Sequence, residues 1–150
     1  MRIPINFKKW IDENQNFFKP PVCNKVVWQD SDFIIMVVGG PNSRKDYHLD
    51  VEEEFFYQVK GDILLKIIDN GKSKDINIKE GEIFLLPANV PHSPQRFKDT
   101  IGLVVEKRRK PDELDGFQWY CDNCFSLLHE KYMHVSDIVI QLPIIFDEFW

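Results

Sequence analysis

Three side chains in the middle of the chain are of types that bind a divalent metal: His48, Glu54 and His92. Two neutral imidazoles and one carboxylate can occupy one face of an octahedral metal and leave the other positions open for further ligands. His92 lies between Pro91 and Pro94, and a proline fixes its own backbone and restrains the residue before it. Taken singly, either histidine is more simply explained as a surface or loop residue. Two histidines and one carboxylate on adjacent strands of a small barrel, however, are what a mononuclear metal site needs.

The segment that must position these ligands has the pattern of short strands. Within it, Asn70-Gly71 tolerates the positive φ that a tight hairpin turn requires. Closely spaced strands with no helical pattern between them are typical of an all-β sandwich or barrel. The expected strands are rich in β-branched and aromatic residues and are separated by turn residues; they cover 26–29, 33–40, 54–59, 63–68, 75–78, 82–87 and 102–106.

The two ends of the chain have other patterns. Apolar residues at helical spacing predict a short amphipathic helix over 6–16, and Pro20-Pro21 would stop it. After Pro111 the strand pattern loosens, and we expect a turn-like segment at 119–124 and an apolar tail at 138–150 that packs on the barrel. The expected organisation is a single domain over 1–150, with a barrel core at about 25–110 and an irregular extension at 111–150.

Composition excludes several classes of protein. The chain has 150 residues, a formal net charge of -5 and 29% charged residues, which argues against a general nucleic-acid or anionic-membrane binder. The basic run Lys107-Arg108-Arg109-Lys110 is followed by Pro111 and two acids, so we expect a solvated loop with local charge pairing there. No apolar run is long enough to cross a bilayer, the start lacks a secretion signal, and three cysteines make no disulfide framework. We therefore expect a cytoplasmic protein.

Four segments carry a resemblance to a known family. They are GGPNSRKDYH at 39–48, EEFFYQ at 53–58, EGEIFLLP at 80–87 and HSPQR at 92–96. These segments resemble the 3-hydroxyanthranilate 3,4-dioxygenase family of the cupin superfamily. The similarity runs from the first helix to the tail and is specific to these enzymes rather than to cupins in general.

The resemblance implies a fold, a cofactor and a reaction. The fold would be the cupin double-stranded β-helix, a jelly-roll barrel, and His48, Glu54 and His92 would bind one Fe(II). The enzyme would use O2 to open the ring of 3-hydroxyanthranilate, giving 2-amino-3-carboxymuconate semialdehyde. That product cyclises to quinolinate, a precursor of NAD in the kynurenine pathway of tryptophan catabolism. The family also implies a homodimer.

The resemblance assigns three further residues, Arg44, Arg96 and Glu106, to catalysis and to binding of the substrate, a small aromatic amino-hydroxy acid. An arginine fork suits a carboxylate and stays charged, and Glu106 could accept a proton or a hydrogen bond from the hydroxyl or amine. If 44–48 is extended, Arg44 and His48 share one face. Without the resemblance, Arg96 is more simply a surface residue and Glu106 a partner of the basic run after it.

Other interpretations remain open. A cupin of another activity, such as an isomerase or a thiol dioxygenase, would share the barrel, although Arg44 and Arg96 together favour a carboxylated substrate. A regulatory cupin usually lacks a metal ligand, whereas all three are present here. The apolar wall of a pocket could come from four residues that core packing explains equally well: Phe33, Ile35, Phe55 and Phe56.

Cys121 and Cys124 depart from the family pattern. The pair resembles the first half of a rubredoxin-like site near the C-terminus of many members, and such a site needs four sulfur ligands. No second Cys-x-x-Cys follows the pair, and Cys23 is distant in sequence. A vestigial pair, a truncated sequence and a reversible disulfide remain open, and we expect no complete second metal site. His129 and His134 are spaced oddly for zinc ligands and are expected to be exposed.

Overall fold

The computed structural model describes residues 1–149, so that Trp150, at the end of the expected apolar tail, lies outside the described residues. Its elements are α1 (Phe7–Glu13), the 3-10 helix η1 (Gln15–Phe18), β1 (Asn24–Val26), β2 (Phe33–Gly39), β3 (Asp46–Leu49), β4 (Glu54–Lys60), β5 (Ile63–Asp69), β6 (Lys72–Ile78), β7 (Ile83–Leu86), β8 (His92–Gln95), β9 (Ile101–Lys107), β10 (Asp115–Tyr120), β11 (Leu127–Met133) and α2 (Ile138–Phe149).

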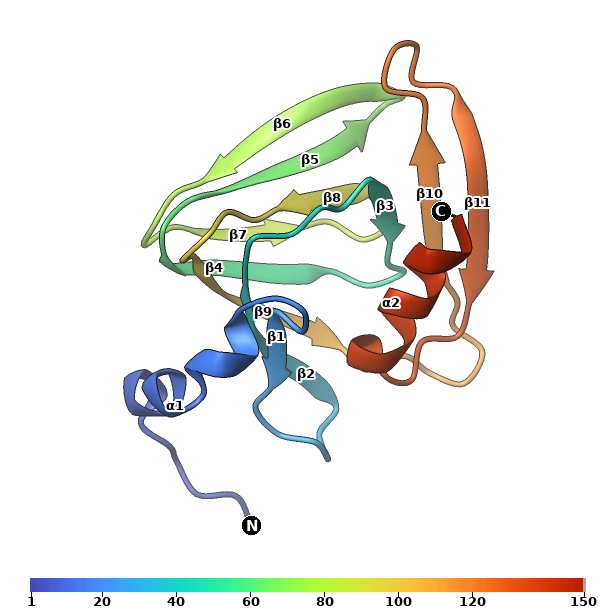
Figure 1. Cartoon of the computed structure of the whole chain (residues 1–150). Coiled ribbons are helices and arrows are strands. Elements are labelled where there is room, and N and C mark those ends of the chain that lie inside the picture. Colours follow the sequence, from blue (N-terminus) through green and yellow to red (C-terminus); the bar gives the residue numbers. More distant parts are fainter. Residues whose placement is uncertain (150) are drawn as a thin grey trace.

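Two antiparallel sheets make the barrel that the strand pattern predicted (Figure 1). One sheet has the order β1-β2-β9-β4-β7 and the other has the order β11-β10-β3-β8-β5-β6. Strands β4 and β5 alternate buried and half-buried residues along most of their length, as expected where one face of a sheet covers a core. The all-β prediction is confirmed.

The predicted hairpin turn lies between β5 and β6. Asn70 has φ 51° and Gly71 has φ 75°, and β5 and β6 pair in continuous register from Asp69–Lys72 to Ile63–Ile78. Two successive residues of positive φ match the right-handed twist of the flanking strands.

The N-terminal helix is shorter than the sequence pattern predicted. Asn6 caps α1 by accepting a hydrogen bond from the Lys9 amide at 2.9 Å, a typical N-terminal cap. The helix ends at Glu13, and the chain tightens into η1 before the two prolines. Ile11 and Phe18 are buried against the outer face of the first sheet with Val37.

The C-terminal segment is regular, which corrects the expectation of an irregular extension. β10 pairs with β3 and with β11, so that residues after Pro111 complete the second sheet. Phe117 and Trp119 are buried in β10, while the residues between and after them are half-buried. This alternation is typical of a strand, but it covers few residues before the turn around Cys121, so it was not recognised in the sequence. The tail forms α2 despite Pro143 within the helix.

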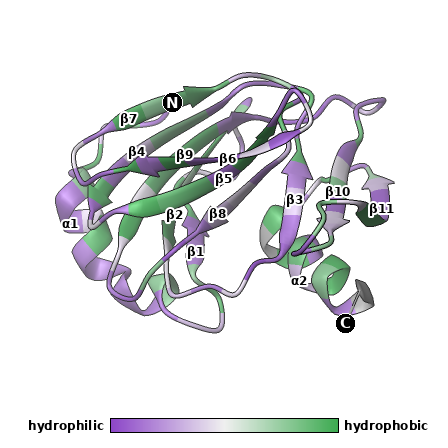
Figure 2. Ribbon diagram, turned by 90° about the horizontal axis from the view of Figure 1, so that it is seen from above, coloured by the Kyte–Doolittle hydropathy of each residue, from purple (hydrophilic) through white to green (hydrophobic). Residues whose placement is uncertain are grey.

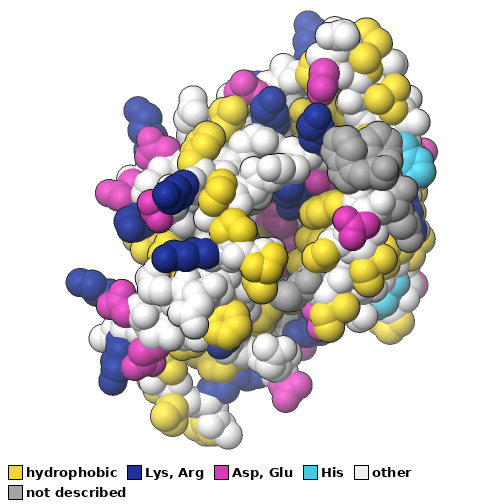
Figure 3. Space-filling view, viewed as in Figure 1, with side chains coloured by type: hydrophobic (Ala, Val, Ile, Leu, Met, Phe, Trp, Pro, Cys, Tyr) yellow, Lys and Arg dark blue, Asp and Glu magenta, His cyan; other side chains and the backbone are white. Residues whose placement is uncertain are grey.

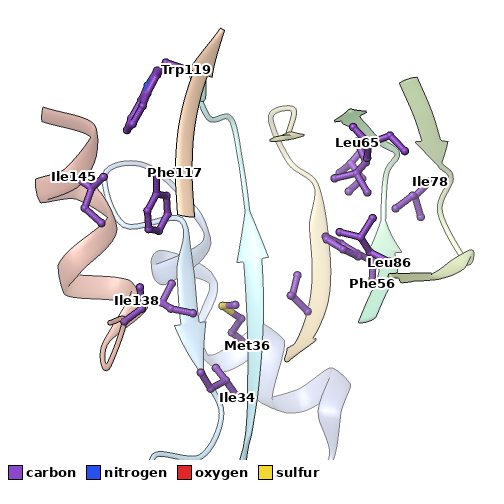
Figure 4. Packing of buried hydrophobic residues seen from close by; sticks show 14 residues of the cluster. Ile34, Met36, Phe56, Leu65, Ile78, Leu86, Phe117, Trp119, Ile138 and Ile145 are labelled. Atoms are coloured by element: carbon purple, nitrogen blue, oxygen red, sulfur yellow. The ribbon is translucent and has the colours of Figure 1, made fainter. Parts of the chain in front are cut away.

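Hydrophobic residues gather in the strands and in α2 (Figure 2). The main core lies between the two sheets, and α2 closes its open side next to β10 (Figures 1 and 4). Ile138 and Ile145 of α2 belong to the same buried cluster as Phe117 of β10 (Figure 4). Among the described residues, no helix is long and apolar enough to cross a membrane.

Candidate metal centre

Strand register brings the predicted metal ligands together. On β3 and β8, His48 and His92 are direct cross-strand partners. In the other sheet, Glu54 on β4 lies opposite Glu106 on β9. The ligand atoms of His48, Glu54 and His92 lie within 4.8 Å of one another, and all three side chains are buried. Neither β3 nor β8 was expected as a strand from composition, yet their pairing is what assembles the site.

A backbone contact fixes the ring of His92. Its Nδ1 lies 2.9 Å from the Val90 carbonyl oxygen, so Nδ1–H donates there and Nε2 keeps its lone pair for a cation. Nε2 faces Glu54 Oε2 at 2.7 Å. A histidine that ligates a metal usually donates its other ring N–H in this way, which sets tautomer and orientation.

His48 is held on two sides. Its ring stacks on Phe117 with 5.1 Å between centroids and 13° between planes. Its Nε2 lies 2.6 Å from Asp115 Oδ2. Both partners belong to β10, so the C-terminal extension orients a predicted metal ligand.

The buried carboxyls and imidazole shift one another's pKa. Burial alone would raise the pKa of Glu54, but the facing His92 imidazole overrides it and lowers that pKa well below its usual range. Burial works against a charged His92, yet Glu54 raises the pKa of this histidine. A cation that binds these side chains therefore competes with a proton on His92.

The donor set fits a divalent metal at His48, Glu54 and His92. Two imidazoles and one carboxylate from adjacent strands can bind one face of an octahedral ion. Ligand atoms in two further groups also lie within 4.8 Å of one another: His48, Asp50 and Asp115, and Asp50, Glu54 and Glu106. The guanidinium of Arg109 contacts Asp50, Asp115 and Glu106 and already places positive charge in both of these groups.

Arg96 is a buried cation facing the same cavity. It is 4% exposed, and among the described side chains no carboxylate lies within ion-pair distance of it. Its Nη1 is buried without a hydrogen-bond partner. Burial and the nearby Arg44 lower the pKa of Arg96 to about 10. An uncompensated buried guanidinium is costly, and an anionic ligand would offset that cost.

Arg44 differs from Arg96 because it already has a carboxylate partner. Its Nε and Nη2 donate to the two oxygens of Asp46 at 3.0 and 2.6 Å, and its guanidinium lies over the Phe146 ring at 5.0 Å. Although burial opposes a charged Arg44, Asp46 raises its pKa. Both arginines line the cavity, and Arg96 is the one with donor capacity to spare.

Glu106 combines burial with a free oxygen. Burial and the neighbouring Glu54 raise the pKa of Glu106 well above its usual range. Its Oε1 lies 3.2 Å from Arg109 Nη1 without hydrogen-bond geometry. Asn24 also lines the cavity, and its Oδ1 is buried with no hydrogen-bond partner. Both oxygens are acceptors that a ligand can use.

The cavity over these groups has a volume of about 80 Å³, and it shares lining residues, Arg44 and Arg96 among them, with a wider recess of about 380 Å³. Figure 3 shows a hollow near the centre of one face with acidic and basic side chains at its bottom. Its wall is otherwise apolar, as ligand pockets commonly are. Of the four candidates for that wall, Phe56 lines the cavity and Phe33 is exposed at the surface. The other apolar wall residues are Met36, Val38, Pro94, Val104, Val135, Ile138 and Leu142.

Comparison with known proteins identifies the family. The family model described as 3-hydroxyanthranilic acid dioxygenase matches residues 1–150. The chain belongs to the 3-hydroxyanthranilic acid dioxygenase family. Over its full length it is 55% identical to the 3-hydroxyanthranilate 3,4-dioxygenase of Xenopus tropicalis, of which it covers 53%. Over 92% of its length it is 51% identical to that of Bacillus thuringiensis, of which it covers 78%.

The chain spans about half the length of animal members of the 3-hydroxyanthranilic acid dioxygenase family such as those of Xenopus tropicalis and Nematostella vectensis. Among solved structures, a cupin-2 domain protein from Shewanella frigidimarina aligns with a TM-score of 0.55 at 19% identity, over 69% of this chain and 94% of that chain. This likeness supports the cupin fold alone.

Because Gly102 has no side chain, it leaves room for the guanidinium of Arg96 beside it. A Cβ at position 102 would lie 2.6 Å from Arg96 Nη1 and 2.6 Å from Gln58 Oε1. We expect Gly102→Ala to displace the guanidinium at a cost of about 0.5–1.5 kcal/mol, which would raise the KM for a carboxylated substrate about 2- to 10-fold. Metal content should not change, and a Gly102→Ala protein with wild-type KM would contradict this placement of Arg96.

The cysteine pair lies apart from the cavity, in the turn between β10 and β11. Cys121 and Cys124 are free thiols, and among the described residues no group of three metal-ligating side chains includes a cysteine. That no complete second site forms stays a prediction. His129 is exposed as expected, but His134 is half-buried, which corrects the expectation, and its Nδ1 donates to the Glu113 carbonyl oxygen at 3.0 Å.

Sequence reasoning missed three side chains of the site. Asp115 and Asn24 carried no motif, and only the resemblance covered their segments. Arg109 was expected in a solvated basic loop, which is wrong: it is buried, whereas Lys107 and Lys110 are exposed. The sequence held no local clue to this, because residues 106–115 contain as many acidic as basic side chains.

Proposed function

We propose that the chain is an iron-dependent dioxygenase that opens the aromatic ring of 3-hydroxyanthranilate with O2. One observation carries this proposal beyond family membership: the unpaired buried guanidinium of Arg96 lies in the same small cavity as His48, Glu54 and His92. A metal triad alone suits many cupins. A triad beside an unpaired buried cation suits an anionic substrate.

The reaction inserts both atoms of O2 into the substrate. The bond that breaks joins the hydroxyl-bearing carbon to its neighbour that carries hydrogen. One oxygen completes a carboxylate at the first carbon and the other forms an aldehyde at the second, so that no external reductant is needed. The product is 2-amino-3-carboxymuconate semialdehyde, whose amine can condense with the aldehyde, lose water and give quinolinate.

Iron(II), when bound by this triad, supplies a Lewis acid and a redox centre that bring the ring and oxygen together. The donor set does not distinguish iron from other divalent metals by affinity, so iron is proposed from the family.

The arginines and Asn24 orient the ring in this scheme. Arg96 binds the substrate carboxylate through its unpaired Nη1, and Arg44, held by Asp46, adds positive charge at the same end of the cavity. Asn24 Oδ1 is an acceptor for the substrate amine or hydroxyl. Fixing the ring in one orientation makes the reaction effectively unimolecular.

Glu106 is the proposed base. Its Oε1 is free of hydrogen bonds and takes the proton of the substrate hydroxyl. A carboxyl whose pKa is raised, as that of Glu106 is, suits a base that must accept a proton near neutral pH. The apolar wall of the cavity excludes water, which strengthens each of these electrostatic contacts.

Anaerobic reconstitution tests the function. The protein is loaded with Fe(II), given 3-hydroxyanthranilate, and then exposed to oxygen in an electrode cell. We expect uptake of one O2 per substrate, and no uptake with anthranilate, which lacks the hydroxyl. An iron-loaded protein that consumes no oxygen with 3-hydroxyanthranilate would contradict the proposal.

The single-domain organisation, a cytoplasmic location and a homodimer are proposed alongside it. The outer face of the first sheet exposes Phe33, Ile83 and Leu85, and strand register places these three on one side. Apolar side chains grouped on an exposed face are typical of a surface that a partner covers, and closed symmetric dimers are the commonest soluble oligomers.

A further inference from the structure

We propose that Arg109 is a positioning residue of the metal centre: it holds Asp115 so that Asp115 fixes the ring of His48, and it holds Glu106 in place at the same time. The inference rests on the proposed function in one respect, which is that His48 binds the metal. It assigns a positioning role to Arg109, for which the sequence pattern had predicted a solvated loop.

The first link joins Arg109 to Asp115. Arg109 Nε donates to Asp115 Oδ1 at 2.8 Å, and Nη2 donates to Oδ2 at 2.5 Å. Two parallel bonds between a guanidinium fork and a carboxylate fix the plane of the carboxylate as well as its distance. Both side chains are buried to about 99% or more, so solvent does not loosen this pair.

The second link joins Asp115 to His48. The same Oδ2 that accepts from Arg109 lies 2.6 Å from His48 Nε2, so in this proposal Nδ1 is the ring nitrogen of His48 left for the metal. Phe117, two residues after Asp115, stacks on the His48 ring. Phe117 therefore sets the plane of the ring, and Asp115 sets its rotation. These contacts restrain a side chain whose own strand, β3, is only four residues long.

The third link joins Arg109 to the remaining buried acids. Its Nη2 lies 3.1 Å from Asp50 Oδ2 and 3.3 Å from Glu106 Oε2. One guanidinium thus contacts carboxylates from three places in the chain: the turn before β4, strand β9 and strand β10. Glu106 and His48 belong to different sheets, and Arg109 is the group that connects their positions.

A purely structural ion cluster is the competing explanation. Such a cluster would stabilise the metal-free and metal-loaded protein equally, so its loss would lower both melting temperatures together. A positioning residue does more, because a misplaced His48 binds metal less well. Mutating a residue that hydrogen-bonds to a metal-binding histidine typically lowers metal affinity about 10- to 100-fold. Weaker metal binding in turn reduces the stabilisation that the metal adds to the folded protein.

The experiment measures Co(II) affinity by chelator competition, the visible absorption of the bound Co(II), and thermal unfolding with and without Co(II). The variants are Arg109→Lys, which keeps the charge but loses the fork, and Asp115→Asn, which keeps the shape but loses the charge. Arg108→Lys is the matched control: it is the adjacent arginine, and it bonds the backbone oxygens of Ser31 and Gln29 away from the site.

We expect both site variants to bind Co(II) about 10- to 100-fold more weakly, with a changed visible spectrum and a smaller rise in melting temperature on metal addition. The control should match the wild type in all three. Site variants that bind Co(II) with wild-type affinity and spectrum, whatever their loss of stability, would overturn the positioning role and leave the proposed function intact. A wild-type protein that does not bind Co(II) would instead overturn the metal centre itself.

Discussion

His92→Ala is expected to abolish metal retention and, with it, oxygen consumption. His92 is 1% exposed and presents Nε2 to Glu54 at 2.7 Å, so its loss removes one of three proposed ligands. Mutating a residue that only hydrogen-bonds to a metal ligand typically lowers metal affinity about 10- to 100-fold. We expect the loss of a ligand itself to lower the affinity by more than that. Metal content after gel filtration, measured by plasma emission spectrometry, checks the result.

His129→Ala is the matched control, because His129 is exposed on β11 and belongs to none of the metal-ligating groups. It should retain metal at the wild-type ratio. Circular dichroism must show that both variants fold. A folded His92→Ala protein that keeps a full complement of iron would show that the metal binds elsewhere.

Arg96→Ala is expected to weaken substrate binding far more than metal binding. Truncating one partner of a buried charge pair costs about 2–5 kcal/mol, and each 1.4 kcal/mol is a factor of ten. The KM for 3-hydroxyanthranilate should therefore rise about 30-fold or more. Because Arg96 lacks a carboxylate partner among the described side chains, its removal leaves no unpaired acid behind, and iron content should stay at the wild-type level.

An analogue without the carboxylate separates this role from a general loss of structure. With 2-aminophenol, wild type and Arg96→Ala should have similar KM values, since the contact that the variant lacks is absent from both complexes. Arg96→Lys should fall between the two proteins with the full substrate, because it keeps the charge but not the planar fork. An equal loss with both compounds would show that Arg96 does not hold the carboxylate.

The proposed metal ligands could be picked out from the sequence, while the residues that contact and orient them could not. Glu54 opens a segment of clear strand pattern, whereas His48 and His92 were singled out by residue type and by the family resemblance. Their supports act across long sequence separations: Asp115 lies 67 residues from the histidine it contacts. No local pattern encodes such a contact, because it follows from the pairing of β10 with β3.

Strand β8 and the inward orientation of Arg109 are two features that escaped prediction for physical reasons. β8 contains Pro94 and polar residues, so it lacks strand propensity, and it is a strand because β3 and β5 pair on its two sides. Arg109 sits in a basic run whose neighbours Lys107 and Lys110 are solvated. Only the fold reveals that one member of the run turns inward to meet Asp50, Glu106 and Asp115.

Isotope labelling tests most directly the proposal that this cavity opens an aromatic ring with O2. The iron-loaded protein is incubated with 3-hydroxyanthranilate under 18O2, and the quinolinate formed is analysed by mass spectrometry. Because cyclisation expels the aldehyde oxygen and keeps the new carboxylate, we predict one heavy oxygen atom in each quinolinate and none when the label is in water. Quinolinate without label from 18O2, or no ring-opened product from the iron-loaded protein, would contradict the proposed function.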